Sequence, residues 1–314
     1  MRASVNLYNN KILISISVIG FIGAIKSLLL HRVGGQEITC RRQVCLSFVF
    51  GLSRNCYTRI MMSNQSYQSY NSQLNKLFTE WKEKSLENGD VIFTEDGLME
   101  KAEARNIDVE KEWRESSKRI MFLLKDQPST SSDDARLWLR DKNMGLKNCE
   151  LKSRFIRNIA NIFWGLYHAD REHLCTVADM KKSFDEIKEC FNTKPFAFIE
   201  CKKQGGGTTI SNNTLKEYLE RYGDFLKREI DILQPNMIVC TSSIIYKFVC
   251  RKYNQEEELI KIDDKHNSIR FHRTSGTLIF CSYHPSARKS HETVYEGVMD
   301  HYRAFLKSDY AKNI

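Results

Sequence analysis

Four short apolar runs of strand length recur along the C-terminal two-thirds of the chain, and segments with helical spacing of apolar residues separate them. The apolar runs are 119–125, 196–199, 237–240 and 278–282. The helical segments are 154–167, 180–191, 215–233, 243–252 and 290–306. Strands that alternate with helices predict βαβ units. We therefore expect an α/β fold, a three-layer αβα sandwich around a central, mainly parallel four-stranded sheet.

The residues before this region have a different pattern. Segments 73–86 and 108–118 carry spaced apolar residues among many charges, which predicts short amphipathic helices. We assign residues 62–115 to a helical cap and 116–314 to the α/β domain. Residues 1–61 form an N-terminal extension without clear periodicity. It is either an upstream false start of the chain, or a signal or membrane anchor centred on the apolar stretch 12–30.

Composition limits the class of protein. A hydrophobic content of 41% with 28% charged residues is typical of a globular chain. The net charge is +9, but residues 1–60 contain eight Lys/Arg and one acidic residue and account for +7 of it. The remaining +2 gives no general signature of nucleic-acid binding, so any anion site must be local.

Cysteine usage indicates the compartment. The ten cysteines are spaced singly, with no CxxC pair, which favours a reduced, cytoplasmic protein with structural thiols. Zinc sites usually show paired ligand spacing, so we expect no metal and no cofactor. We also expect a monomer, with no membrane association unless residues 12–30 are a real anchor.

The loops after the four predicted strands are the places to look for a site, because ligands bind at the carboxyl ends of parallel strands. These loops begin at Asp126, Glu200, Thr241 and Tyr283. The second loop continues into three glycines, 205–207, which allow a ligand to approach the backbone or serve only as a flexible connector.

Two of these loops carry a resemblance to a known family. The first reads Asp126-Gln127-Pro128, and the last reads His284-Pro285-Ser286-Ala287-Arg288. With the helix-then-strand segment 225–240 between them, residues 116–310 resemble the uracil-DNA glycosylase superfamily, and are most similar to its uncharacterised bacterial members. The resemblance implies an enzyme that takes a base out of the stack and cleaves its N-glycosidic bond.

The resemblance also implies roles for individual residues. Asp126 would position water or face the cationic sugar, and His284 would donate to the departing base. Base stacking would fall to an aromatic residue, and Phe155, Phe163 and Trp164 are the candidates. Backbone phosphates would be bound by the following residues: Ser286, Arg288, Lys289, Gly205 and Gly206. Simpler interpretations stay open, because Asp126 could cap a turn, Ser286 could cap the next helix, and Arg288 and Lys289 could be merely solvated.

The chain departs from the family pattern at the base-binding position. Uracil-specific members end their second strand with an Asn, whereas this sequence has Glu200. An ionised carboxylate only accepts hydrogen bonds, so it would favour a base that presents an amino group. The first loop lacks the usual glycines and has Lys125. Only Cys201 lies near a cluster-ligand position, so we expect no iron–sulfur cluster.

Two functions from different classes follow. The first is a glycosylase-like hydrolase that excises a damaged or modified base, with DNA or a nucleotide bound through a local basic loop. The alternative is a non-catalytic module of the same fold that binds a nucleotide or single-stranded nucleic acid.

Overall fold

The structure, a computed structural model, describes residues 68–101, 108–126, 132–140, 149–205, 210–254 and 258–313. The predictions for residues 1–61, including the anchor at 12–30, lie outside the described residues. Gln68–Ile314 form one compact unit. Within the described ranges, no helix combines the length and the apolar character that crossing a membrane requires.

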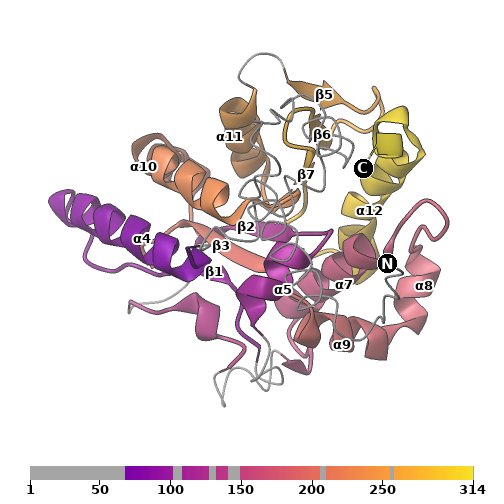
Figure 1. Cartoon of the computed structure of the whole chain (residues 1–314), viewed down its shortest axis with the longest axis horizontal. Helices are drawn as coiled ribbons and strands as arrows, with labels where there is room; N and C mark the ends of the chain where they lie inside the picture. The colour runs from indigo at the N-terminus through magenta and orange to yellow at the C-terminus, as the bar shows by residue number, and fades with distance from the viewer. Residues whose placement is uncertain are drawn as a thin grey trace, which may run out of the picture. The chain divides into compact units, whose positions relative to one another are not determined.

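A seven-stranded sheet forms the centre of this unit, in the order β1-β3-β2-β4-β7-β6-β5 (Figure 1). The four predicted strands are its parallel middle, β3-β2-β4-β7. Their bounds are Ala197–Lys202 for β3, Ile120–Asp126 for β2, Met237–Cys240 for β4 and Thr277–Cys281 for β7. The predicted α/β sandwich is confirmed, with seven strands rather than four.

The three additional strands are antiparallel and lie toward the edges of the sheet. They are β1 (Gly97–Leu98), β5 (Leu259–Lys261) and β6 (Ile269–His272). β1 has only two residues, and β6 alternates buried with half-buried positions. Such strands lack the continuous apolar run that marks a strand buried on both faces, so the prediction passed over them.

Helices cover both faces of the sheet (Figure 1). The first layer packs on one hydrophobic cluster and consists of α7 (Arg154–His168), α8 (Val177–Lys182), α9 (Phe184–Thr193) and α12 (His291–Lys307). The second packs on another cluster and consists of α4 (Tyr70–Glu87), α5 (Val109–Glu115), α10 (Asn212–Leu233) and α11 (Ser243–Tyr253). The 3₁₀ turns η1 (Ala135–Leu137) and η3 (Asp309–Asn313) complete the described elements. We call the two sides of the sheet the α7 face and the α10 face.

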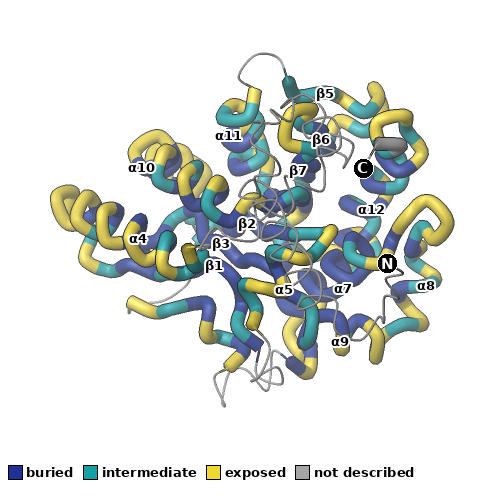
Figure 2. The backbone as a smooth tube through the Cα atoms, in the orientation of Figure 1, coloured by how far each residue is buried: buried dark blue, intermediate teal, exposed yellow. Residues whose placement is uncertain are grey.

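Alternation along the strands decides which side chains enter which layer. Phe122 and Leu124 of β2 are buried on the α7 face, whereas Leu123 is buried on the α10 face. Figure 2 shows the strands as a buried centre between helices that expose their outer sides. Side chains two residues apart on a strand therefore share a face, which fixes the direction of the residues at the strand ends.

The segment predicted as a cap joins the α10 layer. α4 packs on α10, and the indole of Trp113 in α5 donates a 2.8 Å hydrogen bond to the carbonyl oxygen of Leu233. Both helices lie in the same compact unit as the sheet.

Candidate active site

Strand register brings the two predicted catalytic residues to one edge of the sheet. Leu123 of β2 is aligned with Cys240 of β4, which is aligned with Cys281 of β7. Asp126 and His284 each lie three residues beyond this level. Asp126 is the last residue of β2, whereas β7 ends at Cys281, so His284 lies in the loop that leaves the same edge of the sheet.

Both residues also belong to the α7 face. Asp126 follows the inward-facing Leu124 by two residues. The imidazole of His284 lies against Phe155 at the start of α7, with ring centroids 6.0 Å apart. The Phe155 ring is also 5.9 Å from that of Phe198 in β3. Phe155 thus connects the His284 loop with β3 and forms a shared wall above the strand ends.

The His284 loop is held by polar groups of α7. The Asn158 amide, buried on α7, donates a 2.7 Å hydrogen bond to the carbonyl oxygen of Pro285. Its own oxygen lies 2.6 Å from Nδ1 of His291, at the start of α12. Arg154 donates to the carbonyl oxygen of Lys289 at 2.7 Å. These contacts hold the segment that follows His284, between Pro285 and the start of α12, against α7.

Local hydrogen bonding sets the tautomer of His284. The backbone N–H of Ser286 donates to its Nδ1 at 3.2 Å, so the neutral ring carries its proton on Nε2. Burial, and then the nearby Lys125, lower the pKa of His284. The ring is therefore a neutral donor through Nε2 at neutral pH.

Asp126 is a half-buried carboxyl between two lysines. Burial raises its pKa, while Lys202 and then Lys125 oppose the increase. Lys202 is the partner of Asp126 in the β2–β3 register. The lysines thus favour the ionised form of Asp126 and limit the rise in its pKa that burial causes.

Glu200 is in a different environment. It is 2% exposed, and its Oε2 has no hydrogen-bond partner among the described residues. Burial, then Asp96 and Asp126, raise the pKa of Glu200 well above its usual range, and Lys203 opposes them only in part. From the sequence, Glu200 was interpreted as an ionised acceptor, whereas the structure favours a protonated carboxyl, because Lys203 offsets its desolvation only in part.

A buried charge network fixes the end of β3 behind Glu200. Lys203 Nζ lies 2.5 Å from Asp96 and 2.8 Å from Glu229, and all three side chains are fully buried. The other carboxylate oxygen of Asp96 accepts the backbone N–H of Glu200 at 2.7 Å. The network therefore sets the position of the strand that carries Glu200.

The predicted phosphate-binding residues lie in the exposed part of the His284 loop. Ser286, Arg288 and Lys289 are exposed. The helix cap of α12 is Ser290 rather than Ser286, since Ser290 accepts the N–H of Thr293 at 3.1 Å. Gly205 follows β3 at the same edge of the sheet. Gln127, Pro128 and Gly206 lie outside the described residues.

Two predicted aromatic residues are not brought to this edge. Trp164 is nine residues beyond Phe155 on α7, about 13 Å along the helix axis. It is 2% exposed and stacks on His168. Phe163 is fully buried against Phe196, before the start of β3. Of the three candidates, the structure places only Phe155 beside His284.

Asn158 is a functional residue that the sequence analysis missed. It is a polar residue on the apolar stripe of α7, and this was the available signal. A buried amide needs hydrogen-bond partners, and here both partners belong to the His284 region.

A comparison with models of protein families shows to which family the chain belongs. The family model of the uracil DNA glycosylase superfamily matches residues 132–307. The chain belongs to the uracil-DNA glycosylase superfamily. The match includes Phe155, Glu200 and His284, whereas Asp126 lies six residues before it. No curated protein matches the chain.

Proposed function

We propose that this superfamily member is a base glycosylase that hydrolyses the N-glycosidic bond of a damaged base in DNA. The observation that supports this most directly is that Asp126 ends β2 and the His284 loop follows β7 at the same edge of the sheet, with the His284 ring beside Phe155 on the α7 face. The proposal places the sugar and the base of an extruded nucleoside between the carboxyl and the imidazole.

The proposed reaction uses each group in the state that its surroundings favour. As the bond between C1′ and the base nitrogen breaks, its electron pair goes to the base and positive charge develops on the sugar. The Nε2–H of His284 donates to a carbonyl oxygen of the departing base. Asp126 stabilises the cationic sugar and takes the proton of the water that adds to C1′. No metal or cofactor takes part in these steps.

Glu200 suggests the class of base. A protonated carboxyl has one O–H donor and one carbonyl acceptor, as the Asn amide has an N–H donor and a carbonyl acceptor. Deamination converts an amino group into a carbonyl and turns the neighbouring ring nitrogen into an N–H. A neutral Glu200 can therefore pair with the carbonyl and N–H of a deaminated base such as uracil, hypoxanthine or xanthine, which an ionised carboxylate, an acceptor only, could not do.

DNA would be held at the exposed loop that contains Ser286, Arg288 and Lys289. Charge-assisted contacts to backbone phosphates position a nucleic acid without reading its sequence. The sequence-based expectation of a monomeric, cytoplasmic protein is part of this proposal.

The test is cleavage of defined oligonucleotides. The full chain would be incubated with single-stranded and duplex DNA that contains uracil, hypoxanthine, xanthine or only normal bases, and abasic sites would be detected by alkaline strand cleavage. We expect abasic product from one or more deaminated bases. His284→Ala should lower the rate by about 10²–10³-fold, the effect of removing one transition-state donor, and Asp126→Asn should lower it by about 10²–10⁴-fold.

His173→Ala is the matched control, because His173 is an exposed histidine in the segment between α7 and α8, away from the strand ends. It should retain the wild-type rate. Absence of abasic product from all substrates would refute the glycosylase. Salt-dependent DNA binding without cleavage would instead identify the non-catalytic binding module.

A further inference from the structure

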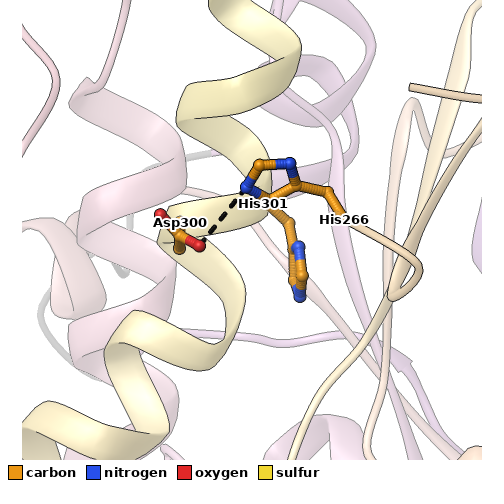
Figure 3. Close-up of side chains that lie close together, drawn as sticks. All are labelled: His266, Asp300 and His301. Carbon is orange, nitrogen blue, oxygen red and sulfur yellow. Dashed lines mark ion pairs between the residues drawn. The ribbon is translucent and has the colours of Figure 1, made fainter. Parts of the chain in front are cut away.

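A second cluster of chemically active side chains contains none of the residues of the candidate active site. It consists of Asp300 and His301 on α12 and His266 in the segment between β5 and β6 (Figure 3). One potential ligand atom from each residue lies within 4.8 Å of the other two. His266 Nε2 is already 3.4 Å from a carboxylate oxygen of Asp300. Two imidazoles and a carboxylate thus converge from two segments of the chain.

A further carboxylate orients His266. Asp263 lies 2.7 and 2.8 Å from Nδ1 of the ring through its two oxygens. Asp263 is itself held by the backbone N–H groups of Lys265 and His266. Since Nδ1–H donates to Asp263, the lone pair of Nε2 is directed toward Asp300. Metal-binding histidines commonly have such a carboxylate on their second nitrogen.

His301 provides the second imidazole. Its Nδ1 is buried and has no hydrogen-bond partner among the described residues. Its ring lies edge-on to that of His266, with centroids 5.3 Å apart. At least one of its nitrogens is thus not used by neighbouring protein groups, and it lies beside a histidine that is already oriented.

The distances agree with a small tetrahedral ion. Ligands at 2.0–2.1 Å from zinc are about 3.3 Å apart in a tetrahedron, close to the 3.4 Å between His266 and Asp300. His301 would close the remaining gap by a modest rotation of its ring. Arg303 approaches the other oxygen of Asp300, at 3.8 Å, and so leaves the oxygen that faces His266 available.

The surroundings are acidic. Asp300 and His301 line a cavity of about 500 Å³ whose wall also includes Glu292, Glu296 and Tyr283. The three carboxylates follow one stripe of α12 at spacings of four residues. Lys181 pairs with Glu292 and Arg303 with Glu296, so Asp300 is the carboxylate that is free to face the histidines.

We propose that His266, Asp300 and His301 bind one divalent transition-metal ion, with Zn²⁺ as the preferred ion and a fourth position left for water. Two imidazoles with one carboxylate select zinc-like ions over Mg²⁺ and Ca²⁺, which prefer oxygen ligands. The site is separate from the proposed glycosylase and does not depend on it. No metal was expected from the sequence, because its cysteines lack the paired spacing of zinc ligands.

Zinc titration of the full chain tests the proposal. The reduced protein would be stripped with EDTA, dialysed and titrated with ZnCl₂ by calorimetry. Its ten cysteines provide a possible background, so the comparison is between variants. We expect one equivalent of Zn²⁺ in the wild type, and loss of that equivalent in His266→Asn, Asp300→Asn and His301→Asn. Asp263→Asn should retain the site with about 10–100-fold weaker affinity, and His173→Asn should bind as the wild type does.

Cobalt substitution identifies the ligands. Co²⁺ should give the visible absorption of a tetrahedral ion without the near-ultraviolet band of thiolate ligands, and His266→Asn should abolish it. Wild-type affinity in His266→Asn, or thiolate absorption that all variants share, would overturn the proposal. So would the absence of any bound equivalent, which would leave His266 as a bridge between Asp263 and Asp300 only. His266 and Asp263 lie outside the helices, so their variants keep the test informative if His301→Asn fails to fold.

Discussion

Replacement of Glu200 by glutamine tests the ionisation state on which the proposed base preference depends. Glu200 is fully buried at the end of β3, and burial raises its pKa well above the usual 4.5. Glutamine has almost the same shape as a protonated glutamate and cannot ionise. If Glu200 is neutral in the folded protein, Glu200→Gln removes only the pH dependence of stability that arises from the proton of Glu200.

The sign and size of the effect follow from that proton. Above pH 4.5 the unfolded chain releases the Glu200 proton while the folded chain keeps it, so the folded state binds one more proton and stability falls as pH rises. Each pH unit in this window costs about 1.4 kcal/mol. The stability of Glu200→Gln relative to the wild type should therefore increase with pH while folded Glu200 keeps its proton, by at most about 2.7 kcal/mol between pH 5.5 and 7.5. For a unit of this size that is roughly 5–10 °C in Tm.

The assay is thermal unfolding of both proteins by circular dichroism at half-unit steps from pH 5.5 to 7.5. Subtracting the two profiles cancels the other titrating groups, including the buried Glu229. Glu217→Gln, at an exposed position of α10, is the matched control and should follow the wild type at every pH. A constant difference between Glu200→Gln and wild type, or one that grows toward low pH, would refute a neutral Glu200.

The remaining predictions concern the supports of the site. Lys203→Met should lower the free energy of unfolding by about 3–5 kcal/mol, because it leaves two buried carboxylates without their cation; a loss below 1 kcal/mol in urea unfolding would contradict this. Asn158→Ala should cost on the order of 2 kcal/mol and lower kcat more than it raises KM, whereas a change in KM alone would argue against loop anchoring. Gly165→Ala should destabilise by about 1–3 kcal/mol, because a Cβ there would meet the Tyr295 hydroxyl at 2.6 Å; an unchanged Tm would contradict it. Burial lowers the pKa of His284, so activity that requires its neutral ring should persist as pH falls through 6.5. A rate that is already lost above pH 6.5 would contradict this prediction.

The buried strands of the fold were predictable because they are buried on both faces. β2, β3, β4 and β7 are apolar runs bounded by loop residues, and this pattern requires no knowledge of the rest of the chain. The hairpin of β5 and β6 was missed because its residues alternate with half-buried or exposed positions, such as Arg270 between Ile269 and Phe271. β6 pairs with the edge of β7, and a local pattern of residues does not show that this edge is available.

The place of a residue in the fold could be predicted where its position along a strand was sufficient, but not where the tertiary environment decides. The ends of β2 and β7 follow from the parallel pattern, so Asp126 and His284 were expected at one edge of the sheet. The ionisation state of Glu200 depends on Asp96, which lies more than a hundred residues earlier in the chain. The contacts of Asn158 and the convergence of His266 with His301 likewise depend on tertiary packing, so no short motif could indicate them.

The arrangement of charges along the strand ends agrees with the proposed cleavage of a glycosidic bond. Desolvation acts on both Glu200 and Asp126, but only Asp126 has two lysines that substantially offset it. Asp126 is consequently the carboxyl that ionises at the lower pH, while Glu200 and His284 offer neutral donors. Such a set places negative charge where a sugar cation forms and hydrogen-bond donors where a base becomes anionic. Exchanging the ionisation states would place a second negative charge beside the departing base and oppose the reaction, so the lysines that flank Asp126 matter to the proposed chemistry as much as the carboxyl itself.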